Sequence, residues 1–305
     1  MRTRLALCAA SVLTLAPGSQ TVPPPQDPSI ARILSRVSEE AGVFLATAPK
    51  MLSQETLEQR ALIPPRRFRP RFGPAALETP KPEYRTRTVL SEYGFAAFKD
   101  SPNALHEFRQ PVSVDGRIVA SPQKAARALA RGLRSDDDAL KKRMLERFEH
   151  YGLRGAVADF GQILLLFSRH RLDDYTFSIT GQALIGAEAA TILSFQQHAG
   201  SANLLVFEKG HAIHQPLEGE IWVRLSDSLP LRITLRSIIQ EGSTVTRHEA
   251  TVDYVPTRHG ALAPVAVVHR EYAGSTLLAE NVCRYSSFRL FSADTELQFN
   301  EPAQK

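Results

Sequence analysis

The stretch GEIWVRLSDSLPLRITLR, residues 219–236, contains two runs in which apolar and polar side chains alternate. Between them lies Ser226–Pro230, which is rich in turn-forming residues. Side chains along a strand point to opposite faces in turn, so the pattern predicts two antiparallel strands that share one apolar face. On that face we expect Ile221, Val223, Leu225, Leu231, Ile233 and Leu235, and on the other face Trp222, Arg224, Arg232 and Arg236.

The same kind of pattern continues on both sides of this stretch. Tyr175, Phe177 and Ile179 alternate before Gly181, and Asp115-Gly116 is a two-residue hairpin signal. Short alternating strands that follow one another indicate an antiparallel meander. Further strands are predicted at Arg85–Phe98, Leu105–Val114, Arg117–Ala120, Ala187–Gln196, Thr244–Tyr254, Ala263–Tyr272 and Leu278–Phe291.

Helices are predicted in two places. Ser29–Ala48 has apolar residues at helical spacing, with Ser29 as a cap and Pro49 at the end. A helical insertion at residues 121–168 interrupts the strands, and its last part, Ala156–Ser168, has the composition of a buried helix. The pattern therefore predicts one α+β domain over residues 29–299, with one antiparallel sheet and its helices on one face.

The first residues have the features of a secretory signal. Arg2 and Arg4 precede the apolar run Leu5–Ala16, which is too short to span a bilayer. We expect a signal peptide at residues 1–20, a proline-rich linker at 21–28, and an exported protein of the periplasm or cell envelope. Cys8 lacks the preceding small residue of a lipidation site, so no lipid anchor is expected, and Cys283 would be the only cysteine after cleavage.

The net charge of +5 favours contact with anions. A cluster of arginines lies in an arginine- and proline-rich loop at residues 63–82, where missing amide donors discourage helix and sheet. Export makes anionic headgroups or acidic glycans better partners for this loop than nucleic acid, and a solvated loop without a partner is the alternative. Its candidate anion-contacting residues are Arg66, Arg67, Arg69 and Arg71, with Phe68 and Phe72 between them.

No motif for catalysis or for a cofactor stands out. The chain lacks a nucleophile elbow and a glycine-rich phosphate loop. His211 and His214 lie in a stretch with loop composition and lack the further ligands that a metal site needs, with His248, His259 and His269 unlinked to them in sequence. The acidic groups at Asp136–Asp138 and Asp173–Asp174 read as helix-start and strand-start residues. We expect no metal and no cofactor, and an enzyme is the third hypothesis behind a binder and a structural domain.

The order of elements, together with the stretches VSVDGRIV at Val112–Val119 and GEIWVRLSDSLPLRI at Gly219–Ile233, is similar to that of exported bacterial proteins of unknown function. It resembles the periplasmic lipoprotein-carrier and lipoprotein-sorting fold. The resemblance implies a curved antiparallel sheet, a half-open barrel, with helices on the concave face. It also implies an envelope protein that binds a lipid or acyl chain without catalysis.

The alternative to a binder is a structural or protein-interaction domain of the envelope whose core is filled by its own side chains. An anionic membrane surface or an envelope protein is then the expected partner. For the binder, the expected ligand-lining residues are Tyr175, Phe177, Ile179, Ile221, Val223, Leu225, Leu231, Ile233 and Leu235.

Overall fold

The computed structural model describes residues 28–64, 81–156, 159–199, 205–208, 211–214, 217–241 and 244–290. Strands dominate this part of the chain, and the helical elements are few. The helical elements are α1 (Pro28–Thr47), η1 (Ala48–Lys50), α2 (Pro122–Arg134), α3 (Asp138–Glu149), and the 3-10 turns η3 (Ile163–Phe167) and η4 (Arg169–Asp174).

An antiparallel sheet of 11 strands forms the body of the protein, in the order β4-β3-β2-β1-β13-β12-β11-β10-β9-β6-β5. A separate pair, β7 (Leu205–Glu208) and β8 (His211–His214), forms a second small sheet. The large sheet contains β1 (Met51–Leu62), β2 (Tyr84–Phe98), β3 (Ser101–Val114), β4 (Arg117–Ile118), β5 (Tyr175–Ile185), β6 (Glu188–Gln197), β9 (Leu217–Arg224), β10 (Pro230–Glu241), β11 (Thr244–Pro256), β12 (Leu262–Ala273) and β13 (Thr276–Leu290).

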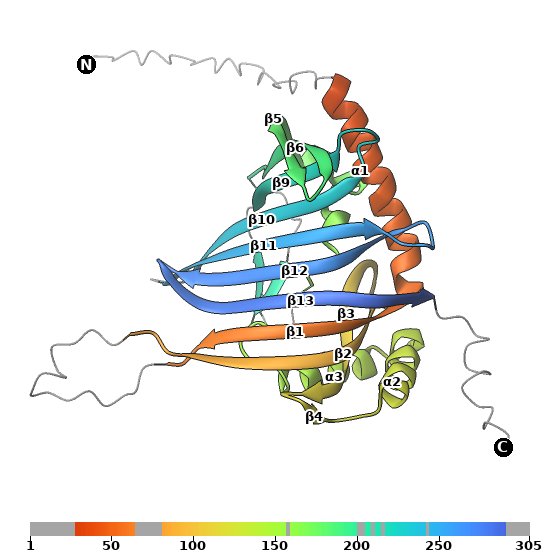
Figure 1. Ribbon diagram of the computed structural model, residues 1–305, viewed down its shortest axis with the longest axis vertical. Helices are drawn as coiled ribbons and strands as arrows, with labels where there is room; N and C mark the ends of the chain where they lie inside the picture. The colour runs from red at the N-terminus through yellow and green to blue at the C-terminus, as the bar shows by residue number, and fades with distance from the viewer. Residues whose placement is uncertain are drawn as a thin grey trace, which may run out of the picture.

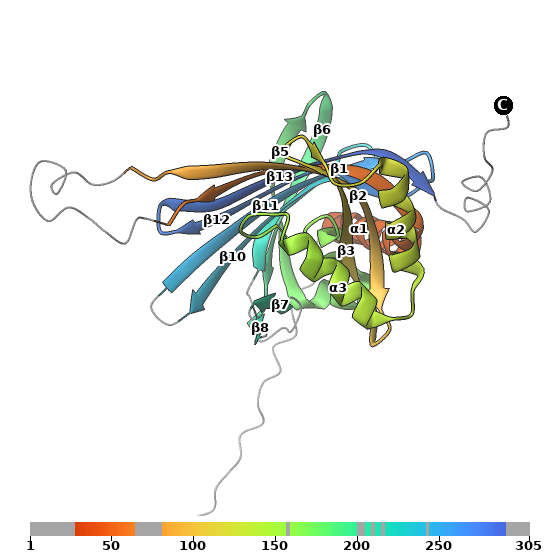
Figure 2. The ribbon, with the colours of Figure 1, turned by 90° about the horizontal axis from the view of Figure 1, so that it is seen from below.

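The sheet is strongly curved and does not close. Figure 1 shows the long strands one below another beside α1, and Figure 2 shows β10 and β3 bending down from the level of β1 and β13. Strand β1 joins the two halves, because it pairs with β2 on one side and with β13 on the other. The structure is therefore the curved, half-open α+β architecture that the sequence predicts.

Helix α1 and the turn η3 fill the concave side. The ring of Phe44 on α1 lies 5.3 Å from that of Phe95 on β2. The apolar side chains of η3 join the same buried cluster, which extends across the sheet to Ile221 on β9 and Ile233 on β10. The core thus lies between the sheet and one helix that crosses it.

The helices do not all lie on this side. Gly94 and Phe95 are neighbours on β2, so they face opposite sides of the sheet. Phe95 belongs to the concave cluster, whereas a side chain at Gly94 would lie 2.8 Å from Leu133 of α2. Leu129 and Leu133 pack with Phe108 of β3 in a second cluster. Helix α2 therefore covers the outer face of β2 and β3, contrary to the expectation of one helical face.

Strand β1 is absent from the predicted elements although it is central to the sheet. Its buried positions alternate as expected, but Ser53, Glu55 and Gln59 occupy three of them. Polar residues at inward positions remove the apolar alternation on which strand prediction depends. The same polar residues belong to the candidate site described below.

The predicted helix at Ala156–Ser168 is wrong in type. Among the described residues of this range, only Ile163–Phe167 is helical, as a single 3-10 element. Gly155 has a φ of +65°, which breaks a right-handed helix, and the amide of Gly161 donates to Glu107 instead of to a helical carbonyl. Short apolar runs can fill a core without forming an α-helix.

Several sequence predictions concern residues outside the described ranges. The signal peptide, the linker up to residue 27, and Arg66, Arg67, Arg69 and Arg71 all lie there. Pro28 begins α1, and Ile63 N donates to Glu83 O at 2.8 Å, which closes the β1–β2 pair before the arginine-rich loop. None of the helices in the described ranges combines the length and apolarity that crossing a bilayer requires.

A glycine in an interior strand of the sheet provides a test of this packing. A Cβ at Gly219 in β9 would lie 2.1 Å from Thr234 O in the neighbouring strand, whereas one at Gly181 in β5 meets nothing within 4 Å. We expect Gly219→Ala to reduce the free energy of unfolding by about 1–3 kcal/mol through overpacking. The matched Gly181→Ala should change it by less than about 0.5 kcal/mol. Urea unfolding measures both, and equal effects would contradict the register of β9 and β10.

Candidate functional site

A buried ionic cluster lies on the concave face of the sheet. It joins Glu55 of β1 with Glu107 and Arg109 of β3, and each of these side chains is at most 3% exposed. The Nε of Arg109 donates to both carboxylate oxygens of Glu55, at 3.0 and 2.8 Å. Its Nη2 donates to Glu107 Oε2 at 2.6 Å. The guanidinium also lies 5.2 Å from the ring centre of Tyr93.

Strand register places these groups together. Tyr93 of β2 is paired with Arg109, and Phe95 is paired with Glu107, so all four share the concave face. Glu55 comes from β1, on the other side of β2, and reaches the same guanidinium because the sheet bends there. A charged group that is removed from water must be paired and hydrogen-bonded, which this arrangement provides.

A second polar chain lies next to the first. Gln59 of β1 donates to Asn281 Oδ1 of β13 at 2.7 Å. Asn281 Nδ2 lies 3.3 Å from His269 Nδ1, and His269 Nε2 lies 3.2 Å from His248 Nδ1. Since the Asn281 amide group is a donor, the His269 proton is assigned to Nε2, from which it is donated to His248.

Both groups hold the backbone of one segment, residues 152–167, which we call the plug segment; residues 157 and 158 lie outside the described ranges. Leu153 N donates to Gln59 Oε1 at 2.6 Å, and Asn281 donates to Gly155 O at 2.8 Å. Gly161 N donates to Glu107 Oε1 at 2.5 Å. The polar side chains of the sheet therefore act as fixed partners for main-chain groups that cross the concave face outside regular structure.

The hydroxyl of Tyr254 on β11 completes this attachment. It accepts from Leu164 N and donates to Gly161 O, both at 3.1 Å. Gly161 fits there because a Cβ would lie 2.8 Å from Tyr93 Oη and 2.9 Å from Glu107 Oε1. The plug segment is thus anchored at both ends by buried side chains.

Glu107 has a strongly perturbed proton affinity. Burial raises its pKa to about 8, and the carboxylates of Asp159 and Glu55 act in the same direction. The guanidinium of Arg109 and the amide of Gly161 oppose the change. Asp159 itself accepts from the amide of Glu107 at 2.9 Å and lies 2.8 Å from His106 Nδ1. Glu107 therefore changes its protonation state close to neutral pH.

Two other titratable groups of the site, His269 and Cys283, are held neutral. Burial and the neighbouring His248 lower the pKa of His269 to about 3. Burial raises the pKa of the Cys283 thiol, with Glu55 adding to the effect. A neutral thiol is a poor nucleophile. Binding and positioning of polar groups fit this set of residues better than acid-base or nucleophilic chemistry.

A small cavity lies between the two polar groups. Its volume is about 10 Å³, and its lining includes Arg109, His269, Asn281, Cys283 and Tyr285. Among the described residues, Arg109 Nη1 has no hydrogen-bond partner. A volume of about this size holds one water molecule. The ionic cluster thus retains one donor that the protein itself does not satisfy.

The residues expected to line a ligand fall into three groups. Ile221, Val223, Ile233 and Leu235 lie in the concave core, as does Tyr175 at the start of β5. Leu231 is buried, and Phe177 is partly buried against the core. Ile179 and Leu225 are 42% and 53% exposed; Ile179 lies in β5 at the edge of the sheet, and Leu225 begins the turn after β9. The register thus brings most of this set together, and contact with a ligand stays a prediction.

The arginines of the same strands lie on the outer face as predicted, and so does Trp222. The indole Nε1 donates to Glu220 Oε2 at 2.9 Å, and the guanidinium of Arg232 lies 5.9 Å from the ring centre. Arg232 in turn pairs with Asp253 of β11 at 2.5 Å. The tryptophan is therefore part of a network of polar side-chain contacts on the outer face, between neighbouring strands.

The remaining candidates are scattered. His211 and His214 begin and end β8, so this stretch is a strand where a loop is predicted. Within the described residues, no group of three or more His, Cys, Asp or Glu side chains is arranged to hold a metal ion. Asp137 caps α3, and Asp138 accepts from Lys99 N. Asp173 and Asp174 end η4 before β5.

The polar groups of the candidate site were not predicted as a site. The sequence draws attention to His248 and His269, but as isolated histidines. Glu107 and Arg109 stand at alternating positions of a predicted strand, which is a detectable signal, but surface strands show the same pattern. Only the partners across the sheet distinguish a buried charge from a solvated one.

The ionic cluster predicts an unequal effect of two arginine substitutions. Arg109→Met leaves Glu55 buried without its cation and Glu107 without a hydrogen-bond donor, so we expect a loss of about 3–5 kcal/mol in the free energy of unfolding. Arg232→Met breaks a pair whose side chains are both 31% exposed, and it should cost less than about 1 kcal/mol. Urea unfolding of the two variants makes the comparison. A similar small loss for both would show that the Glu55–Arg109–Glu107 cluster is hydrated.

Glu107 predicts a pH dependence of stability. Its pKa rises from 4.5 to about 8 on folding, so between these values the folded protein keeps a proton that the unfolded chain releases. Stability should then fall as pH rises from about 5 to 8, with a contribution of up to about 1.4 kcal/mol per pH unit. Glu107→Gln should remove this contribution, whereas Glu146→Gln on the exposed side of α3 should keep it. An unchanged slope in Glu107→Gln, measured by urea unfolding, would contradict the assignment.

No family model matches the chain, and no curated protein matches it. Similar solved structures include a DUF1329 family protein from Desulfovibrio piger, a LolA superfamily protein from Nitrosomonas europaea and a putative outer membrane lipoprotein-sorting protein domain from Vibrio parahaemolyticus. In that order they are 11%, 12% and 10% identical, with TM-scores of 0.32, 0.29 and 0.31. The alignments cover 88%, 87% and 88% of this chain and 95%, 96% and 95% of the matched chains. Two of the three have the names of the lipoprotein-carrier and lipoprotein-sorting group that the order of elements resembles. At these identities and TM-scores, the likeness supports no statement about the function of this chain.

Proposed function

We propose that the protein binds an acyl chain of a lipid in the hollow of its sheet, without catalysis, at the cell envelope. The bound state would be one in which the plug segment leaves the concave face and the acyl chain takes its place. The proposal rests on the way in which the plug segment fills the hollow of the sheet.

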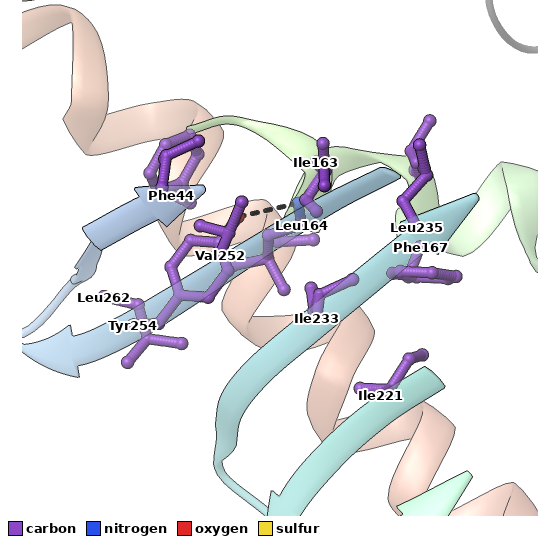
Figure 3. Packing of buried hydrophobic residues seen from close by; sticks show 14 of the residues in the cluster. Phe44, Ile163, Leu164, Phe167, Ile221, Ile233, Leu235, Val252, Tyr254 and Leu262 are labelled. Atoms are coloured by element: carbon purple, nitrogen blue, oxygen red, sulfur yellow. Dashed lines mark hydrogen bonds between the residues drawn. The ribbon is translucent and has the colours of Figure 1, made fainter. Parts of the chain in front are cut away.

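Next to α1, a short irregular segment occupies the hollow, which strand side chains alone do not fill. Figure 3 shows Ile163, Leu164 and Phe167 of the plug segment pointing toward Ile233 and Val252 of the sheet. All of these side chains are at most 5% exposed. A flexible hydrocarbon chain offers the sheet the same kind of surface as these side chains, so the exchange preserves most of the apolar contact.

The plug segment is attached in a way that permits exchange. Its helical part, η3, has only 5 residues, and 3-10 turns have poorer hydrogen-bond geometry than α-helices. Its buried backbone groups are satisfied by side chains of the sheet, such as Glu107, Tyr254 and Asn281. On release, water can satisfy the plug backbone, and the sheet side chains can hydrogen-bond an ester or amide group of the lipid.

A filled structural core is the competing function. Ile221, Ile233 and Val252 are 0% exposed, and the cavity beside the ionic cluster has room for about one water molecule. If the plug segment never leaves, this is the packing of an ordinary domain core. The two functions differ in whether an open state is populated and takes a ligand.

Tyr254→Phe tests the proposal, because it removes both hydrogen bonds of the hydroxyl to the plug segment and keeps the ring. Two hydrogen bonds contribute about 1–2 kcal/mol to the closed state. Weakening the closed state raises the fraction of molecules whose plug segment has left the concave face, and the apparent affinity for a ligand of that open state rises in proportion. A fluorescent long-chain fatty acid should therefore bind about tenfold more tightly to this variant. Fluorescence titration measures the affinity.

The matched control is Tyr272→Phe, whose ring stacks with Arg247 away from the plug segment and which should bind as the wild type does. Mass spectrometry of organic extracts from the purified wild type should also detect a co-purified lipid. If neither folded protein binds the fatty acid and the extracts contain no lipid, the filled-core function holds instead.

A further inference from the structure

A continuous basic segment follows the β3–β4 hairpin. Residues 117–134 contain Arg117, Lys124, Arg127, Arg131 and Arg134 and no acidic residue. These residues belong to β4, to the connection after it, and to α2. In the fold they lie at one end of the long axis, at the bottom of Figure 1.

The basic side chains of α2 point away from the protein. Its buried residues, which include Leu129 and Leu133, pack on the outer face of β2 and β3. Lys124, Arg127 and Arg131 are exposed, and their spacing of three and four residues places them on the opposite face of the helix. Packing on the sheet therefore orients the cationic face toward the surroundings.

Exposed apolar side chains lie beside this cationic face. Ile118 is 84% exposed, more than any other large apolar residue in the described part of the chain, and Val119 is 41% exposed. Ile118 lies in β4, a two-residue strand at the edge of the sheet, and the main chain runs from it directly into α2. Val119 N and Ala120 N both donate to Val112 O, which fixes this corner to β3.

We propose that β4 and α2 form a docking surface for a membrane with anionic lipid headgroups. The arginine and lysine side chains would contact phosphate groups, and Ile118 and Val119 would enter the headgroup boundary. A row of basic side chains next to exposed aliphatic residues is the combination that interfacial membrane elements use. An acidic protein partner would match the basic side chains but leaves Ile118 unexplained, so the membrane is the better fit.

This surface is separate from the hollow of the sheet. The basic face of α2 lies on the outer side of β2 and β3, whereas the plug segment lies on the concave side. The proposal therefore does not depend on the proposed acyl-binding function. Together they would place an acyl-binding hollow and a lipid-facing surface in the same molecule.

Co-sedimentation with vesicles tests the docking surface. The full chain should sediment with phosphatidylcholine vesicles that contain phosphatidylglycerol, and much less with pure phosphatidylcholine vesicles. The triple variant Lys124→Gln, Arg127→Gln, Arg131→Gln should bind the anionic vesicles at least about 30-fold more weakly, because each basic residue near the surface contributes about a fivefold factor.

A charge-matched control distinguishes binding by this surface from an effect of the net charge of the protein. Arg32, Arg169 and Arg258 are exposed on α1, on η4 and in the turn between β11 and β12, away from α2. The triple variant Arg32→Gln, Arg169→Gln, Arg258→Gln should retain most of the binding. Ile118→Ser keeps every charge and should weaken binding about threefold to tenfold, through loss of apolar insertion.

Three results would overturn the proposal. They are no preference for anionic vesicles, an equal loss of binding in the two triple variants, and full binding by the first triple variant. Binding of the wild type to polyglutamate without binding to anionic vesicles would assign the surface to an acidic protein instead. Circular dichroism of each variant confirms that the comparison is made between folded proteins.

Discussion

The buried guanidinium of Arg109 is the constraint on which the concave face depends. Moving a charge out of water is expensive, so Arg109 requires both Glu55 and Glu107 at hydrogen-bond distance. These partners come from different strands, and their meeting fixes the bend of the sheet at β1, β2 and β3. Glu107 then uses its second oxygen to hold Gly161 N. One ion cluster thus sets both the curvature of the sheet and the position of the plug segment.

The hollow has two chemically different halves as a result. Around β1, β3 and β13, the inward side chains include the polar residues Glu55, Gln59 and Asn281. Around β9 to β11 they are aliphatic, as with Ile221, Ile233 and Val252. The plug segment follows this division: the backbone of Leu153 and Gly155 bonds to Gln59 and Asn281 of the polar half, and the side chains of η3 lie in the apolar cluster with the aliphatic half. A lipid with a polar group at one end of an acyl chain has the same division.

The outer face of the sheet is covered differently in its two halves: one half carries ion pairs between strands, and the other is packed against α2. Over β9 to β11, arginines pair with acidic residues across strands, as in Arg232 with Asp253, and the charges are balanced locally. Over β2 and β3, Leu129 and Leu133 of α2 cover the outer face and leave the basic side of that helix outward. Helix α2, with its basic side outward, lies at one end of the molecule (Figure 1). This orientation follows from where α2 packs, because its sequence alone does not say which partner its apolar side meets.

The sequence by itself determined the strands with apolar inward faces, because alternation between Ile221, Val223 and their neighbours is a local property of the chain. It also determined the hairpin at Asp115-Gly116, where positive φ at both residues is a local requirement of the turn. Only the tertiary structure decided that β1 is a strand and that Ile163–Phe167 is a 3-10 turn. Glu55 and Gln59 are stable inside the protein only through Arg109 and Asn281, which are 54 and 222 residues away in sequence. A buried polar residue has no local signature, since its partner is supplied by another strand.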